Sequence, residues 1–112
     1  RIAQVVLFGY QVGLGETSTF TAANLRIWRG FPAAEGSQVV FGDPTTNRLV
    51  DTRWTGIYRV READSGIAAD RPVMANTLGA GVILEPGRYW VDFQADGTLP
   101  SGPWCPPIDV RR

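Results

Sequence analysis

The stretch RYWVDFQ, Arg88 to Gln94, lies between two turn signals, EPG before it and ADG after it, and it decides the fold class. In a β-strand, successive side chains point to opposite faces of the sheet. One alternate set is wholly apolar and predicts a core face: Tyr89, Val91 and Phe93. The other set places an indole among charged and amide groups: Arg88, Trp90, Asp92 and Gln94. This second face is our first candidate for a binding surface.

The rest of the chain repeats short apolar and aromatic runs between clusters of Gly, Pro, Asn and Asp, without helical periodicity. This pattern predicts an all-β fold, a single antiparallel β-sandwich of about eight strands. We expect strands at residues 2–11, 23–29, 38–41, 48–62, 73–78, 81–84, 88–94 and 108–110. The segments 73–78 and 81–84 form one or two of them. A chain of 112 residues fits one such domain, residues 1–112. Its start at Arg1 suggests a piece of a longer polypeptide.

Several segments carry finer expectations. The first strand is apolar on both faces, which predicts a central strand covered on both sides. In the second, Leu25 and Ile27 face inward, whereas Arg26 and Trp28 face outward. A bulge or a close approach is expected at Gly56. The segment ADSGIAADRP, residues 63–72, reads as a loop, and its last proline argues against regular pairing there.

Charge and composition remove several function classes. Eleven acidic residues balance eleven basic ones, all arginine, so no net field draws the chain to nucleic acid. The apolar runs are too short for membrane insertion. Without histidine, no Ser-His or Cys-His pair can form. Paired carboxylates, Asp92 with Glu85, Asp96 or Asp51, are the remaining catalytic option, but acidic residues at turns usually solvate or cap. We therefore predict no enzyme. Cys105, among prolines, is expected to be a packed thiol.

Calcium is the one metal that oxygen ligands alone would hold here. GDPTTN offers Asp43 and Asn47, and the loop after the fourth strand offers Asp64 and Asp70. Asp and Asn also start turns by hydrogen bonding to their own backbone, and this explanation is favoured. We predict no cofactor and keep calcium as an alternative.

The outward aromatic surface is the stronger indication of function. It combines two strands, and its members are Arg26, Trp28, Arg88, Trp90, Asp92 and Gln94. An indole stacks on the apolar face of a sugar, and the polar groups bind hydroxyls, although a peptide or a protein partner fits as well. A structural explanation stays open. In it, the proline-rich tail with Trp104 covers the tryptophans, and Arg88 pairs with Asp92.

Four segments together resemble a poorly characterised β-sandwich module of large secreted and cell-surface bacterial proteins. They are NLRIWRG (24–30), VVFGDPTTNRL (39–49), WTGIYRV (54–60) and LEPGRYWVDFQADGTLPSGPWCPP (84–107). The resemblance implies a jelly-roll-like accessory domain of an exported protein, with no catalytic motif and no defined ligand.

These observations favour a non-catalytic extracellular binding or adhesion module, with a glycan or protein partner at the cell surface. The alternative is a structural spacer that associates with copies of itself through sheet edges and the apolar first strand.

Overall fold

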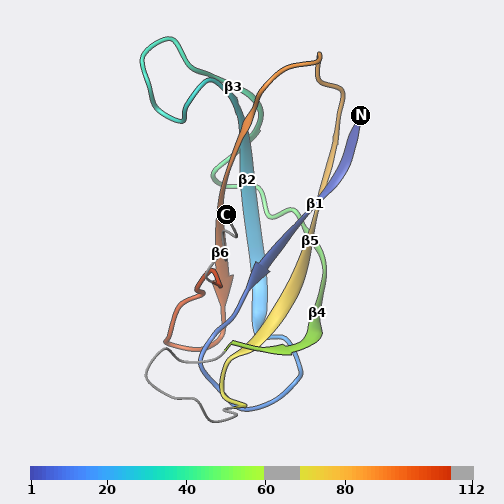
Figure 1. Cartoon of the computed structure of the whole chain (residues 1–112), viewed down its shortest axis with the longest axis vertical. Helices are drawn as coiled ribbons and strands as arrows, with labels where there is room; N and C mark the ends of the chain where they lie inside the picture. Colours follow the sequence, from blue (N-terminus) through green and yellow to red (C-terminus); the bar gives the residue numbers. More distant parts are fainter. Residues whose placement is uncertain (60–68, 107–112) are drawn as a thin grey trace, which may run out of the picture.

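A computed structural model describes residues 1–59 and 69–106 of the chain (Figure 1). These residues form six strands: β1 (Ile2–Gly9), β2 (Phe20–Arg29), β3 (Gln38–Asp43), β4 (Leu49–Tyr58), β5 (Pro72–Val82) and β6 (Trp90–Gly97). The described ranges contain no helix, so no described element is a helix able to span a membrane. The strand expected at residues 108–110 lies outside the described residues, as do Val60 and residues 61–68.

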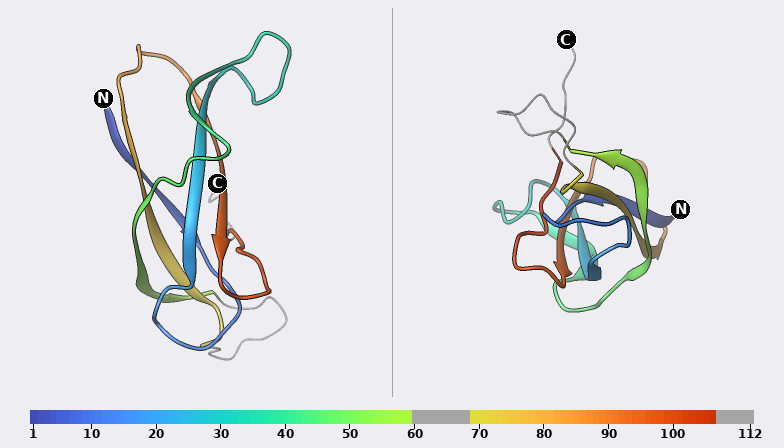
Figure 2. Two further views of the ribbon diagram at one scale, coloured as in Figure 1. Left: turned by 180° about the vertical axis from the view of Figure 1, so that it is seen from behind. Right: turned by 90° about the horizontal axis from the view of Figure 1, so that it is seen from below.

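The six strands form two antiparallel sheets of three strands each, with orders β1-β5-β4 and β3-β2-β6. The two sheets face each other in the side and end views (Figure 2). The all-β, sandwich-like architecture predicted from the sequence is therefore confirmed. β2 and β5 are the central strands, and β6, which carries the WVDFQ part of the RYWVDFQ motif, is an edge strand beside β2.

The core lies where β2 faces β5. Alternate side chains of β2, Ala23, Leu25 and Ile27, are buried together with Leu78 of β5. Leu25 and Leu78 have no exposed surface at all. Burying one such side chain stabilises the fold by about 1.5–3 kcal/mol, so this small cluster carries a large part of the packing between the sheets. The inward positions of Leu25 and Ile27 are those expected from the alternation.

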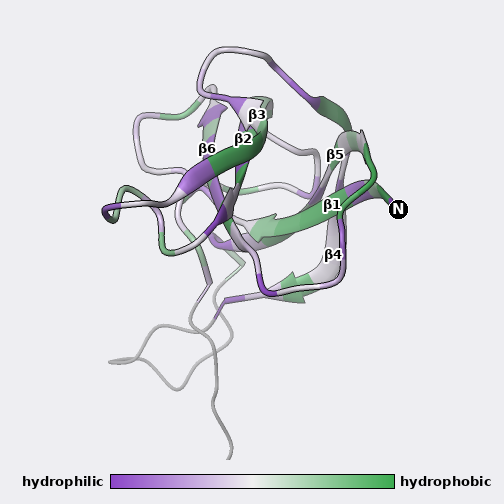
Figure 3. Cartoon of the chain, turned by 90° about the horizontal axis from the view of Figure 1, so that it is seen from above, coloured by the Kyte–Doolittle hydropathy of each residue, from purple (hydrophilic) through white to green (hydrophobic). Residues whose placement is uncertain are grey.

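β1 is not the covered central strand that its sequence suggested. It lies at the edge of its sheet, and Val6 and Phe8 are 43% and 54% exposed. Figure 3 shows β1 as hydrophobic over much of its length. Apolar residues on both faces therefore reflect an open edge strand, and the expectation of two covered faces is wrong.

The structure confirms one of two expectations about the backbone, at Gly56, and contradicts the other, at Pro72. Gly56 has a φ of +85°, and the pairing of β4 with β5 shifts register between Trp54 and Tyr58, which confirms the bulge. Pro72, however, pairs with Tyr58 as the first residue of β5. The expected lack of pairing there is wrong, because a proline is tolerated at the first position of a strand.

The chain after β6 returns to the end of β1. The backbone N–H of Trp104 donates to the Tyr10 carbonyl at 2.8 Å, and that of Tyr10 donates to the Trp104 carbonyl at 2.9 Å. Gln11, only 3% exposed, donates through Nε2 to the carbonyls of Leu99 (2.9 Å) and Ser101 (3.0 Å). This buried amide fixes the loop that carries Trp104 back to β1.

Candidate functional site

The outward face of β2 and β6 forms a ladder of directly opposed side chains. Its rungs are Trp28–Trp90, Arg26–Asp92, Asn24–Gln94 and Ala22–Asp96. We call this row of four pairs the β2–β6 ladder. Successive rungs are two residues apart along each strand, so the row is about 20 Å long at 3.4 Å per residue. Antiparallel pairing thus brings the two predicted tryptophan strands side by side.

The second rung is a tightly connected polar cluster. Arg26 bonds one oxygen of Asp92, Oδ2, through Nη2 at 2.6 Å and Nε at 3.0 Å. The indole Nε1 of Trp28 donates to the same oxygen at 3.3 Å, and the Arg26 guanidinium lies 5.4 Å from the centre of the Trp28 ring. The two charged side chains are 35% and 28% exposed. These contacts hold the carboxylate and the indole in one arrangement at the surface.

Arg88 does not take the place expected for it. Its backbone precedes β6, its side chain is exposed, and it makes no contact with Asp92 among the described residues. The partner of Asp92 is Arg26, directly opposite on β2. The alternative in which Arg88 pairs with Asp92 is therefore wrong.

The aromatic end of the ladder is larger than predicted. The ring of Phe31, 66% exposed in the loop after β2, lies edge-on to Trp90 with centroids 6.4 Å apart. Arg29 reaches Tyr89, whose hydroxyl accepts a bond from Nη2 at 3.4 Å and raises the pKa of that guanidinium. Phe31 was missed because a single aromatic residue in a loop has no periodic signal.

Trp104, in the described part of the proline-rich tail, does not cover this aromatic end. A Cβ placed on Gly9 would lie 2.9 Å from the Phe20 ring and 3.3 Å from the carbonyl oxygen of Trp104. Trp104 therefore lies near the start of β2, eight residues or about 27 Å along the strand from Trp28. Trp28 and Trp90 are both partly exposed.

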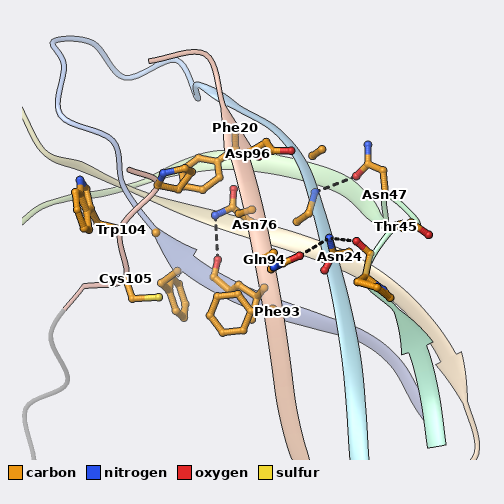
Figure 4. Close-up of a pocket in the computed structure, with 18 residues that line it drawn as sticks. Phe20, Asn24, Thr45, Asn47, Asn76, Phe93, Gln94, Asp96, Trp104 and Cys105 are labelled. Atoms are coloured by element: carbon orange, nitrogen blue, oxygen red, sulfur yellow. Dashed lines mark hydrogen bonds between the residues drawn. The ribbon is translucent and has the colours of Figure 1, made fainter. Parts of the chain in front are cut away.

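A cavity of about 640 Å³ lies at the other end of the ladder (Figure 4). Ala22, Asn24, Gln94 and Asp96, which form the last two rungs, are among its lining residues. Figure 4 shows Trp104 and Cys105 on one side of β6, with Asn24, Thr45 and Asn47 on the other. Sequence reasoning missed this cavity, because its described walls come from six separate segments of the chain.

The lining combines aromatic rings with amides. The rings come from Phe8, Phe20, Phe93 and Trp104, and the amides from Asn24, Asn47, Asn76 and Gln94. Asn76 belongs to the framework, because its Nδ2 donates to the Leu7 carbonyl at 3.2 Å and its Oδ1 accepts from Thr52 at 2.6 Å. Among the charged residues that the structure describes, only Asp96 lines the cavity.

In the calcium candidate GDPTTN, the Asp43 carboxylate is hydrogen bonded to other residues of the same turn. Asp43 Oδ1 accepts bonds from the backbone N–H groups of Thr45 (2.9 Å) and Thr46 (2.6 Å), and Oδ2 accepts from the Thr46 hydroxyl (2.8 Å). These bonds, led by that from the Thr45 backbone, hold the pKa of Asp43 well below its usual range. The Asn47 side chain caps Ala23 and Leu49 instead.

The other metal candidates are Asp64 and Asp70. Asp64 lies outside the described residues, and the backbone carbonyl of Asp70 accepts a bond from Gly13 at 2.8 Å. No group of three His, Cys, Asp or Glu side chains suited to a metal forms within residues 1–59 and 69–106. Cys105, expected to be packed, is exposed, so that expectation is wrong.

Comparison of the chain with models of protein families, with curated proteins and with solved structures gave no match.

Proposed function

We propose that this domain is a non-catalytic binding module of an exported bacterial protein, secreted or at the cell surface, and that the β2–β6 ladder contacts its glycan or protein partner. The observation that carries the proposal is the row of Trp28 and Trp90 beside the Arg26–Asp92 pair. We also propose that the two sheets belong to a jelly-roll-like sandwich with about eight strands, as the resemblance to modules of such proteins implies.

A glycan is the partner that fits the ladder best. Indole rings provide flat apolar surfaces for the C–H faces of sugars, and Gln94 and Arg88 provide exposed donors at the edges. The Arg26–Asp92–Trp28 contacts hold the polar groups in place before any ligand arrives. Binding then requires less ordering of side chains, which favours affinity.

A glycan array and a polysaccharide pull-down test this proposal. Trp28→Ala and Trp90→Ala are compared with Trp54→Ala, because Trp54 lies on β4 in the other sheet and packs against Tyr58. We expect the wild type and Trp54→Ala to retain a glycan that both ladder variants release while remaining folded. Equal binding by all four proteins would remove the ladder as the site.

Self-association is a second candidate, supported by the edge position of β1. The strand IAQVVLFG has no charged residue and exposes Val6 and Phe8, although natural edge strands usually carry charges that prevent pairing. Light scattering across a concentration series would show a dimer that Val6→Lys dissociates. A monomer at every concentration would exclude this function.

A further inference from the structure

We infer that the cavity at the Asn24–Gln94 end of the ladder binds one end of a neutral oligosaccharide. The inference rests on the proposed function, since the ladder leads from the two tryptophans to this cavity. The cavity volume of about 640 Å³ lies within the roughly 300–1,000 Å³ of ligand sites in proteins. Because the last two rungs also line the cavity, one extended ligand can contact both regions.

The charge of the lining selects a neutral ligand. Among residues 1–59 and 69–106, Asp96 is the only charged residue in the lining, and no arginine of these ranges contributes to it. The closest guanidinium along the ladder, that of Arg26, is already bonded to Asp92 at 2.6 Å. An anionic sugar would meet the Asp96 carboxylate, and no described lining residue is a cation that offsets it, whereas a neutral polyol avoids this repulsion.

Both donors and acceptors are free for sugar hydroxyls. The Asp96 carboxylate, the Gln94 Nε2 and the Asn47 Nδ2 have no hydrogen-bond partner among the described residues. A hydroxyl group donates one bond and accepts others, so it matches a wall with a carboxylate acceptor beside amide donors. An apolar ligand would leave these groups unsatisfied.

The aromatic wall is held in place without a ligand. Trp104 is 52% exposed, yet its Nε1 donates to the Ser101 hydroxyl at 2.9 Å and its backbone pairs with Tyr10. A Cβ on Gly102 would lie 2.6 Å from Trp104 Cδ1, so the ring lies directly against residue 102. Phe93, 37% exposed, adds a second ring. Aromatic rings that are exposed and already held in one orientation can stack on the flat C–H face of a pyranose ring.

Isothermal titration calorimetry tests the inference with neutral hexasaccharides of glucose, mannose and xylose and with an anionic galacturonate hexasaccharide. The wild type is expected to bind at least one neutral sugar and not the anionic one. Trp104→Ala should lower that affinity about tenfold, the loss expected for one stacked ring. Asp96→Asn, a surface change that leaves the fold intact, should lower it about fivefold, because a charge-assisted bond is lost.

Asp51→Asn is the matched control, since Asp51 lies on the other sheet and its carboxylate forms an ion pair with Arg53. Unchanged affinity in both cavity variants, together with loss in Trp90→Ala, would overturn the cavity site and leave the ladder standing. Binding of the galacturonate, or of a peptide in place of any sugar, would overturn the ligand class. A wild type that binds none of the sugars would contradict the glycan proposal for the ladder as well.

Discussion

The Arg26–Asp92 pair gives the most specific energetic prediction. Fully exposed ion pairs contribute about 0.2–1 kcal/mol, and breaking a buried pair costs about 3–5 kcal/mol. These two side chains are 35% and 28% exposed, between those limits. We therefore expect a coupling energy of about 1 kcal/mol between them. Asp92→Ala alone should lower the free energy of unfolding by about 2 kcal/mol, because the indole N–H of Trp28 also loses its acceptor.

The assay is a double-mutant cycle of Arg26→Ala, Asp92→Ala and the double variant, followed by urea unfolding with tryptophan fluorescence. The denaturant slope should stay constant across the four proteins, and the coupling should shrink at high salt. A coupling energy below about 0.3 kcal/mol would show that the two sites are independent. That result would refute the ladder geometry, since the register of β2 and β6 places the two residues directly opposite each other.

Three other predictions follow from burial and backbone geometry. Leu25→Ala should lower the free energy of unfolding by about 3 kcal/mol, because Leu25 is fully buried. Val91→Ala should lower it by less than about 1 kcal/mol, because Val91 is 46% exposed. Equal losses of the two variants in urea unfolding would place Val91 in the core. Gly42→Ala should destabilise the fold by about 2 kcal/mol or more, because the φ of Gly42 is +88° and an added Cβ would overlap the Leu25 carbonyl. Gly36→Ala should destabilise it by only about 1 kcal/mol, because the φ of Gly36 is +80° but an added Cβ would meet open space. A thermal melt that ranks the two glycine variants in the opposite order would contradict this reading. Because the pKa of Asp43 is lowered on folding, its contribution to stability is present above the usual Asp pKa of about 3.9 and is lost as the pH falls further. In a carboxyl NMR titration it should still be ionised at about pH 3, and a midpoint near 4 would contradict the hydrogen-bonded turn.

Strand alternation predicted which side chains share a face, because its period of two is set by the backbone. Leu25 and Ile27 lie in the core, and Trp28 and Trp90 lie together on the outward face. The alternation of side chains along a strand does not, however, predict how exposed each of them is. Val91 shares the inner face as expected but is 46% exposed, because β6 is an edge strand.

Contacts between strands were harder to predict, because they depend on strand order. From the sequence, Arg88 was the nearest cation to Asp92 on its face, four residues or about 14 Å along the strand. A directly opposed residue on the neighbouring strand is closer, about 5 Å between Cβ atoms, and so Arg26 pairs with Asp92 instead. The position of β1 at the edge of its sheet could not be predicted either, because it also depends on strand order.

The cavity had no local signal in the sequence at all. Phe20, Asn47 and Trp104 meet there only because the chain after β6 returns to Tyr10. The exposed position of Cys105 follows from the same return. This return of the chain depends on contacts between residues that are far apart in the sequence. Buried Gln11, for example, donates hydrogen bonds to carbonyls that lie 88 and 90 residues further along the chain.

The central claim is that the β2–β6 ladder binds the ligand. The most direct measurement is a ¹⁵N NMR titration of the wild-type domain with the glycan that the array selects. We expect amide shifts concentrated at residues 24–31 and 90–96, with the indole N–H signals of Trp28 and Trp90 among those that move and that of Trp54 unchanged. Shifts confined to β4 and β5 on the other sheet would contradict it.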